Sequence, residues 1–511
     1  MNLGVLNLNL FMKTRSSITI VLFFFFISLF IGVVTVFWIN DYVAEDWFAS
    51  NTSLPGSTKK EYTRNCSSGN VTRTCPTTRE LNQSSATTCP EYFQWIHEDL
   101  RPWQRTGISR AMLEGGQDVA HFRLVIVGGR VYVKKYKKVF QTRDVFTIWG
   151  IVQLTRLYPG MLPDLELLFY CGDKTAIKKR NYHEGSNPTS PPPVFHYCGD
   201  DDSLDIVFPD WSFWGWAEIN VRPWKSLLED IKEGNKRINW KDRLPYAYWK
   251  GNARVGGRAD LMKCNVSDKY DWNGRFYLQD WYKEAEEGYK NSRLQDQCTH
   301  RYKVYIEGRG WSVSEKYILA CDSMTLLVKP RYFDFFMRSM KPMQHYWPIR
   351  NNNKCRDIKF AVEWGNNHTE EAMAIGKEGS KFMSENLRME KVYDYMFHLL
   401  REYAKLLKYK PSIPSGAEEV CSETMACAQV GVWQKFMEES MVKCPSDKPP
   451  CILLPPYEPK ALQAIIGEKE RTVRQLEMWE TRYWKSLNTW KNSNTWHSLV
   501  KFFESIRYIS K

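Results

Sequence analysis

The chain has 511 residues, too many for one ordinary domain, and this length predicts roughly two to four domains. Apolar residues make up 43%, which excludes a disordered chain and allows sizeable cores. The formal net charge of +13 comes from 71 Lys and Arg against 58 Asp and Glu. Because this excess is scattered and no nucleic-acid-binding motif accompanies it, we expect solvated basic faces and no nucleic-acid partner, with attraction to anionic ligands as the alternative.

An uncharged apolar segment lies near the N-terminus, at residues 18–39. As a helix rising about 1.5 Å per residue it would be roughly 33 Å long, enough to cross the hydrocarbon core of a bilayer. Lys13 and Arg15 precede it and acidic residues follow, so the positive-inside rule places residues 1–17 in the cytoplasm and the rest in a lumen. A cleaved signal peptide is the alternative, but the run is long and ends in no clear cleavage site. The pattern predicts a single-pass type II anchor.

Cysteines and glycosylation sequons also point to an oxidising lumen. The 13 cysteines lack CxxC pairs and histidines at zinc spacing, which favours disulfides over a metal site, and their odd number predicts one unpaired thiol. Residues 40–90 are rich in Ser, Thr and Asn and are predicted to form a glycosylated stem. Asn-x-Ser/Thr sequons occur at Asn51, Asn65, Asn70, Asn82, Asn265 and Asn367.

After the stem, patterns of strands and helices alternate along the chain. Residues 121–127 and 130–133 predict a hairpin across Gly128-Gly129. A helix is expected at 258–263, another from about residue 313, and two more before residue 407. Strand–turn–helix units in two halves predict an α/β fold with parallel sheets. Further strands are predicted at 165–170, 194–197, 247–250, 303–307 and 325–328.

The segment 302–323 carries the most informative turn. A predicted strand runs into Gly308-x-Gly310, and Ser312 and Glu315 have capping-box spacing directly before an apolar helical run. Glycines allow close approach of a ligand, and a helix N-terminus offers N–H groups with partial positive charge, so the pattern is typical of a diphosphate-binding loop. An ordinary strand–helix turn with a capped helix would give the same pattern.

The segment 248–262 repeats this arrangement. Its predicted strand ends in a glycine-containing turn, and Arg254 and Arg258 follow before a helix begins. Guanidinium groups at this place could bind phosphate oxygens bidentately, although surface salt bridges are the alternative for both arginines.

Asp173 follows the predicted strand 165–170, at the carboxyl end where open α/β sheets hold their sites. A carboxylate there could accept a proton from a substrate hydroxyl. A turn-capping aspartate is the alternative.

Several segments together resemble the Rumi-like protein O-glucosyltransferase family, which includes fungal capsule-associated xylosyltransferases. The resemblance covers residues 92–409 in consistent order. It is closest to the plant branch of the family, mainly through the segment WSVSEKYILACDS. The segments are LPDLELLFYCGD, FPDWSFWGW, YAYWKGN with GGRADL, YKVYIEGRGWSVSEKYILACDSMTLLV, FFMRSMKPMQHYWPI and EGSKFMSENLRMEKVYDYMFHLLREYAKLL.

The resemblance implies a GT-B fold with two Rossmann-like lobes, at 91–235 on the acceptor side and 236–410 on the donor side. UDP-glucose or UDP-xylose would bind between the lobes, chiefly to the second. The residues after 410, at 411–511, form an extension of unknown role that includes a charged helical segment at 459–484.

The resemblance also implies the roles of individual residues. Asp173 matches the catalytic base, and Asn252 and Arg258 match donor-binding positions. Animal relatives have an arginine where this chain has Ser314, so Arg309 or Arg254 is the alternative source of that charge. The diphosphate loop matches Arg309, Gly310, Trp311, Ser312, Val313 and Ser314.

The family does not depend on a D-x-D metal motif, so the resemblance argues against metal binding at Asp200–Asp202. We therefore predict no metal site, and a solvated turn at these aspartates.

The sequence thus predicts an inverting glycosyltransferase in which Asp173 deprotonates an acceptor hydroxyl on a protein or polysaccharide and UDP leaves. His196 and Glu315 are the alternative bases. A non-catalytic lumenal sugar-binding or scaffold protein is the alternative function. A glycoside hydrolase would need two carboxylates facing the scissile bond, and no pairing in this sequence indicates them. The C-terminal residues carry no KDEL-type retrieval signal, so the anchor would determine the compartment in which the protein is retained. This favours the Golgi over the endoplasmic reticulum.

Overall fold

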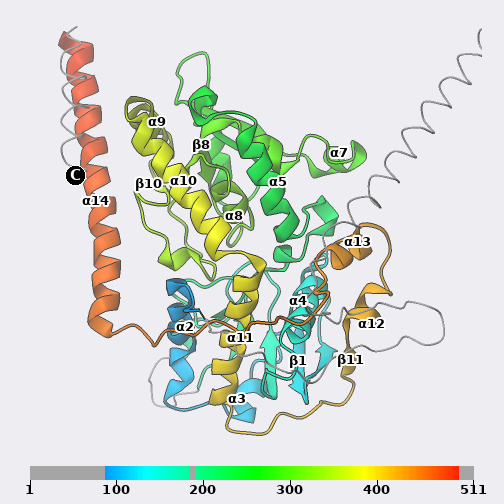
Figure 1. Ribbon diagram of the computed structural model, residues 1–511. Coiled ribbons are helices and arrows are strands. Elements are labelled where there is room, and N and C mark those ends of the chain that lie inside the picture. The colour runs from blue at the N-terminus through cyan, green and yellow to red at the C-terminus, as the bar shows by residue number, and fades with distance from the viewer. Residues whose placement is uncertain (1–86, 183–189, 494–511) are drawn as a thin grey trace, which may run out of the picture. The chain divides into compact units, whose positions relative to one another are not determined.

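The computed structural model describes residues 87–182 and 190–493, so the predicted anchor at 18–39 and nearly all of the predicted stem lie outside the described residues. In the described part, no helix combines the length and apolar character needed to span a membrane. The predicted mixed α/β architecture with parallel strands is confirmed: the described residues form two separate sheets with helices around them (Figure 1). A large buried core lies beside each sheet.

The first sheet defines what we call the first lobe. Its strand order is β11-β2-β1-β3-β4-β5, in which β3, β4 and β5 run parallel and the other neighbours are antiparallel. The predicted hairpin is confirmed as β1 and β2, and every residue of β3 is buried, as expected for an apolar strand covered on both faces. The strands are β1 (Phe122–Val127), β2 (Arg130–Lys135), β3 (Leu165–Phe169), β4 (Val194–His196), β5 (Ile206–Val207) and β11 (Glu418–Val420).

The second sheet defines the second lobe and is parallel throughout, in the order β10-β9-β8-β6-β7. Read from β7, the strands occur in the chain order 2-1-3-4-5, so the winding reverses between β6 and β8. Open sheets of this kind hold ligands at that switch point, outside the carboxyl ends of the strands. The strands are β6 (Leu244–Gly251), β7 (Gly274–Leu278), β8 (His300–Tyr305), β9 (Met324–Val328) and β10 (Trp347–Ile349).

Helices connect and cover these strands. Three helices, and not the expected two, lie between residues 354 and 406, because His368 leaves the helical conformation while apolar side chains continue at helical spacing on both sides. The α-helices are α2 (Trp95–Gln104), α3 (Arg110–Glu114), α4 (Arg143–Leu157), α5 (Trp224–Lys236), α6 (Arg258–Met262), α7 (Trp281–Glu286), α8 (Ser314–Leu319), α9 (Lys354–Asn367), α10 (Thr369–Asn386), α11 (Met389–Leu406), α12 (Ser422–Ala426), α13 (Gly431–Glu439) and α14 (Pro459–Ser493).

Short 3₁₀ turns complete the connections. They are η1 (Glu91–Gln94), η2 (Lys179–Asn181), η3 (Trp211–Phe213), η4 (Ala217–Ile219), η5 (Trp240–Asp242), η6 (Leu294–Gln297) and η7 (Met337–Ser339).

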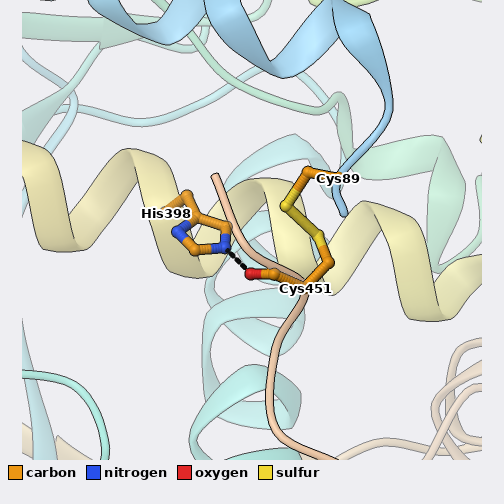
Figure 2. Close-up of side chains that lie close together, drawn as sticks. All are labelled: Cys89, His398 and Cys451. Atoms are coloured by element: carbon orange, nitrogen blue, oxygen red, sulfur yellow. Dashed lines mark hydrogen bonds between the residues drawn. A yellow bond between two sulfur atoms is a disulfide. The ribbon is translucent and has the colours of Figure 1, made fainter. Parts of the chain in front are cut away.

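The segment after residue 411 is built into both lobes. Its strand β11 pairs with β2 at the edge of the first sheet, and Leu476 and Trp479 of α14 are buried in the second core. Cys451 forms a disulfide with Cys89, across 362 residues of sequence. His398 donates to the Cys451 carbonyl at 2.7 Å, as Figure 2 shows. Although Cys89, His398 and Cys451 cluster like metal ligands, the two sulfurs are bonded to each other, so they are not thiolate ligands.

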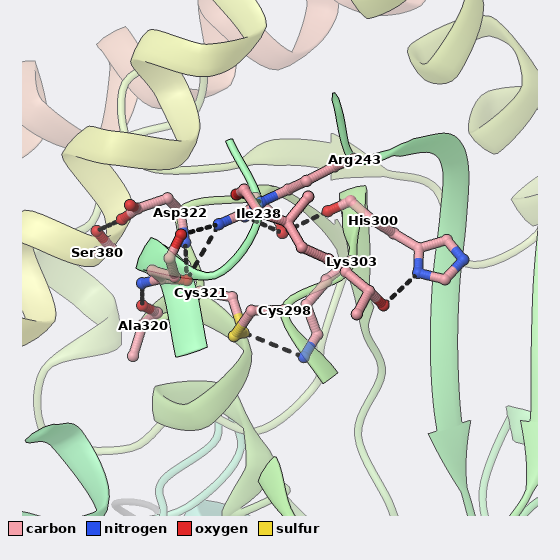
Figure 3. Close-up of a disulfide and its surroundings, with 12 residues drawn as sticks. Ile238, Arg243, Cys298, His300, Lys303, Ala320, Cys321, Asp322 and Ser380 are labelled. Atoms are coloured by element: carbon pink, nitrogen blue, oxygen red, sulfur yellow. Dashed lines mark hydrogen bonds between the residues drawn. A yellow bond between two sulfur atoms is a disulfide. The ribbon is translucent and has the colours of Figure 1, made fainter. Parts of the chain in front are cut away.

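Two further disulfides, Cys264–Cys355 and Cys298–Cys321, lie in the second lobe. Figure 3 shows the surroundings of Cys298–Cys321, where Lys303 Nζ lies 3.3 Å from Cys321 Sγ. Burial lowers the pKa of Lys303 to about 7.

The expectation of a single unpaired thiol is wrong. Cys171 and Cys198 are both free and buried in the core of the first lobe. Each follows a parallel strand, and burial raises the pKa of both thiols, so they act as small apolar core residues. An odd cysteine count could not distinguish such packed thiols from paired ones.

Candidate active site

Two glycine-containing turns lie side by side at the switch point of the second sheet. One follows β6 and the other follows β8, and these strands are adjacent and parallel. A Cβ atom on Gly256 would lie 2.3 Å from the carbonyl oxygen of Gly308, and Gly256 has a φ of +58°. The turns can therefore approach this closely only because position 256 is glycine.

Arg258, the first residue of α6, holds the two turns together. Its guanidinium donates to the carbonyls of Glu307 at 3.1 Å and Ile306 at 3.2 Å, and to Ser312 Oγ at 3.0 Å. A longer bond of 3.4 Å reaches the carbonyl of Asn252. All four acceptors are neutral, and Arg258 forms no ion pair with any carboxylate in the described part of the chain. Burial lowers the pKa of Arg258, so this arrangement favours an anion beside its guanidinium.

The loop from Arg309 to Ser314 follows the main-chain carbonyls after β8 that Arg258 contacts and includes its hydroxyl partner, Ser312. Ser312 Oγ lies 2.8 Å from Ser314 Oγ, and Ser312 N donates to Tyr305 Oη at 3.2 Å. Arg309 and Arg254, the two alternative sources of positive charge, are both exposed and form no ion pair with another described residue. Val313 is the N-cap of α8.

The predicted capping box at the start of α8 is wrong. No side chain caps this helix, and Glu315 N donates instead to the carbonyl of Ser312 at 3.1 Å. The hydroxyl of Ser312 accepts a hydrogen bond from Arg258 instead of capping the helix, and the Glu315 side chain is buried within the protein. The tertiary contact with Arg258 has displaced the local capping interaction.

Asp173 lies at the carboxyl end of β3 with its side chain 41% exposed. Arg143 Nη1 donates to Oδ1 of Asp173 at 2.9 Å. No backbone N–H from the described residues donates to this carboxylate, so its contacts are not those of a turn cap.

The structure brings Asp173 against the second-lobe loop. A Cβ on Gly310 would lie 1.7 Å from the carbonyl oxygen of Asp173, which is far inside van der Waals contact. The predicted base and the predicted diphosphate loop are therefore neighbours although they belong to different lobes. Asn252 and Arg258 join the same cluster through the bonds of the Arg258 guanidinium.

An aromatic cluster anchors this loop in the first lobe. The ring centroid of Trp311 lies 5.7 Å from His196, 5.4 Å from Tyr197 and 6.0 Å from Trp211. These contacts bury Trp311 and fix the loop relative to β4 and η3. Sequence reasoning missed Trp211, which lies in the segment FPDWSFWGW, because aromatic packing across lobes leaves no local pattern.

The two alternative bases are buried. Burial lowers the pKa of His196 to about 4, and its Nδ1 is hydrogen-bonded to the Tyr170 carbonyl at 2.8 Å. Burial and the nearby Asp334 raise the pKa of Glu315 well above its usual range. Asp173 is thus the most accessible of the three candidate bases.

The aspartates at 200–202 divide into one structural residue and two exposed ones. Asp200 is buried, and its oxygens accept from Thr175 Oγ1 at 3.1 Å, from Lys178 Nζ at 3.3 Å and from the Asp202 amide at 3.1 Å. Although burial alone would raise it, hydrogen bonds from Ser203 and the charge of Lys178 hold the pKa of Asp200 below its ordinary value. Its donors are protein groups that complete a turn.

The second lobe is thus a Rossmann-like parallel sheet with a guanidinium at its switch point, and the turn that carries Asp173 packs against the adjoining loop, an arrangement compatible with a glycosyltransferase. The family model of glycosyl transferase family 90 matches residues 84–480, and the chain belongs to this family.

Several curated proteins are similar to this chain. The O-glucosyltransferase rumi homolog of Aedes aegypti is 26% identical over 333 residues, covering 63% of this chain and 80% of that protein. Protein O-glucosyltransferase 1 of Homo sapiens is 24% identical over 352 residues, covering 66% and 85%. Protein O-glucosyltransferase 2 of Danio rerio is 26% identical over 342 residues, covering 65% and 66%. The resemblance to the Rumi-like family is confirmed, and the closer relation to its plant branch stays a prediction.

We predict that Gly310→Ala destabilises the protein, because the new methyl group meets the main chain of Asp173, which cannot rotate away. The expected cost is about 1–3 kcal/mol of unfolding free energy, as for other overpacked sites. Gly308→Ala is the matched control in the same loop, since its nearest neighbour would be Arg258 Nη2 at 3.6 Å. Thermal unfolding checks the pair, and equal melting temperatures would contradict the close approach of Gly310 to Asp173.

Proposed function

We propose that this protein is an inverting glycosyltransferase that moves glucose or xylose from a UDP-sugar to a hydroxyl group of a protein or glycan acceptor. The observation that carries the proposal is that two lobes contribute to one place. Arg258, whose guanidinium hydrogen-bonds only to neutral acceptors, holds the second-lobe loop, and the main chain of Asp173, whose carboxylate is partly exposed, packs against Gly310 of that loop. The names of the relatives, which are O-glucosyltransferases, support transfer of a sugar to protein.

On the donor side, the diphosphate is proposed to bind beside Arg258 and the loop from Arg309 to Ser314. A phosphate oxygen would supply the negative charge that Arg258 lacks among its described partners. Arg254 and Arg309 are exposed at the same turns and would add charge where animal relatives have an arginine at the position of Ser314. In this proposal arginines, and not a metal at Asp200–Asp202, stabilise the leaving diphosphate.

On the acceptor side, Asp173 is proposed to remove the proton of the attacking hydroxyl. The hydroxyl oxygen forms a bond to the anomeric carbon while the bond from that carbon to the diphosphate oxygen breaks, and the electron pair leaves with UDP. A single displacement inverts the anomeric centre, so an α-linked donor gives a β-linked product.

The cellular setting is proposed to be the lumen of the secretory pathway, in the Golgi or, as the alternative, the endoplasmic reticulum. The apolar run at 18–39 and the sequons that follow it support a type II orientation. The three disulfides among the described residues fit an oxidising compartment.

We predict that an N-glycosidase lowers the apparent mass of the protein expressed in eukaryotic cells, because the sequons between Asn51 and Asn82 would be lumenal. Gel mobility before and after treatment checks this, with protein made in bacteria as the unglycosylated control. An unchanged mobility would contradict the lumenal orientation.

We predict that Asp173→Asn lowers the rate of sugar transfer by about 10²–10⁴-fold, since the amide keeps the size of the carboxylate but cannot accept the proton. UDP affinity and melting temperature should stay near those of the wild type. Asp164→Asn is the matched control at the other end of β3, where Asp164 Oδ1 only accepts the Gly128 amide at 2.8 Å. Transfer at a wild-type rate by folded Asp173→Asn would show that the base lies elsewhere.

We predict that Arg258→Ala weakens UDP binding by about 1.5–3 kcal/mol, the contribution of a charge-assisted hydrogen bond. Titration calorimetry with UDP measures the change, and circular dichroism shows whether the variant is folded. Arg237→Ala is the control, because it removes an arginine that pairs with Asp296 on the surface. An unchanged affinity in folded Arg258→Ala would remove this residue from the donor site.

A further inference from the structure

Arg143 contacts the turn that carries Asp173 at two points. Its Nη1 atom donates to Oδ1 of Asp173 at 2.9 Å and also lies 3.3 Å from the carbonyl oxygen of Cys171. One guanidinium nitrogen therefore bridges the side chain of Asp173 and the main chain two residues before it. This contact braces the end of β3 and fixes one carboxylate oxygen.

The place of Arg143 in the fold is unfavourable for stability. It is the first residue of α4, where the partial positive charge of the helix N-terminus disfavours a cation, and its side chain is only 8% exposed. Its partner carboxylate is 41% exposed, so solvent weakens the attraction that would offset this burial.

The same helix contains an arginine with the opposite properties. Arg156 lies in the last turn of α4, where a cation is favoured, and its Nη1 lies 3.1 Å from an oxygen of Glu423. The two side chains are 3% and 1% exposed. The Arg156–Glu423 pair has the environment of a structural ion pair, and the Arg143–Asp173 pair does not.

Aromatic rings hold the Arg143 guanidinium in one orientation. Its Cζ lies 4.6 Å from the ring centroid of Trp211 and 5.2 Å from that of Phe140. Trp211 in turn packs against Trp311 of the second-lobe loop. The guanidinium is thus placed by the same aromatic cluster that places the predicted diphosphate loop.

We propose that Arg143 is a positioning residue for the base, an inference that rests on the proposed function of Asp173. Arg143 occupies Oδ1, while Oδ2 accepts no hydrogen bond from the described residues and is the oxygen that receives the proton. In the transfer step the acceptor O–H bond breaks, its proton goes to Oδ2, the freed oxygen bonds to the anomeric carbon, and the diphosphate leaves with the electron pair of the broken bond. Arg143 touches neither substrate and acts through Asp173.

The test is a double-mutant cycle on the purified full-length chain, with Arg143→Ala, Asp173→Asn and the double variant. The assay is hydrolysis of UDP-glucose or UDP-xylose, whichever the wild type turns over faster. In Arg143→Ala, kcat should fall about 10–100-fold through misplacement of the base, while KM stays within about twofold of wild type. In the Asp173→Asn background, adding Arg143→Ala should lower kcat no further.

Arg156→Ala is the matched control, and it should lower the melting temperature while kcat per folded molecule stays at the wild-type value. If Arg143→Ala does not fold, the same cycle is run with Arg143→Lys and Arg156→Lys. The proposal is overturned by an unchanged kcat at Arg143, by a rise in KM alone, or by equal losses in the wild-type and Asp173→Asn backgrounds. A wild-type rate in Asp173→Asn would instead remove the proposed base itself.

Discussion

The contact between Gly310 and the main chain of Asp173 is the constraint on which the candidate site depends. The two residues belong to different lobes, and no side chain could be accommodated between their backbones. Close approach brings a turn of the parallel second sheet onto the carboxyl end of β3. A second glycine contact, between Gly256 and Gly308, joins the two second-lobe turns in the same way. Backbone-to-backbone packing through glycine therefore defines the geometry before any charged group is considered.

Two arginines occupy this geometry with different electrostatic surroundings. Arg258 is held by neutral oxygens and retains its attraction for an anion, whereas Arg143 is paired with the carboxylate of Asp173. If Arg258 were paired with a carboxylate and Arg143 were not, the proposed donor site would be neutralised and Asp173 would lose the hydrogen bond that orients one of its oxygens. A cation without a carboxylate hydrogen-bond partner and a cation paired with one therefore lie on opposite sides of the contact between the lobes, which fits the proposed binding of a diphosphate at one and the proposed proton transfer at the other.

Much of the fold could be predicted because the central strands are continuous apolar runs. Segments such as 165–169 and 325–328 are buried throughout, and their apolar runs predict strands without any tertiary information. The strands β5, β7, β10 and β11 were missed. All four lie at sheet edges; β5, β10 and β11 have only two or three residues, and β7 and β11 are partly exposed, so the pattern is weak.

The local turns of the candidate site could be predicted from the sequence, but its long-range contacts could not. Glycine turns after strands pointed to the segments around Arg258 and Gly310, since that pattern is local. The role of Arg143 was not visible, because it depends on a contact across 30 residues. The failed capping box has the same cause: Arg258 and Ser312, 54 residues apart, form a bond that local spacing cannot reveal.

The spacing of Asp173 and Arg258 also depends on how the chain passes between the lobes. After the second sheet, α11 returns to the first lobe, where Tyr403 donates to the carbonyl of Glu166 in β3 at 3.0 Å. The chain then crosses again to α14, where Glu480 pairs with Arg350 of the second lobe. The Cys89–Cys451 disulfide ties the segment before this last crossing to the start of the first lobe. Because these connections act on both lobes, substitutions in them should change transfer through the spacing of the proposed base, Asp173, and the proposed donor cation, Arg258, even where they contact neither.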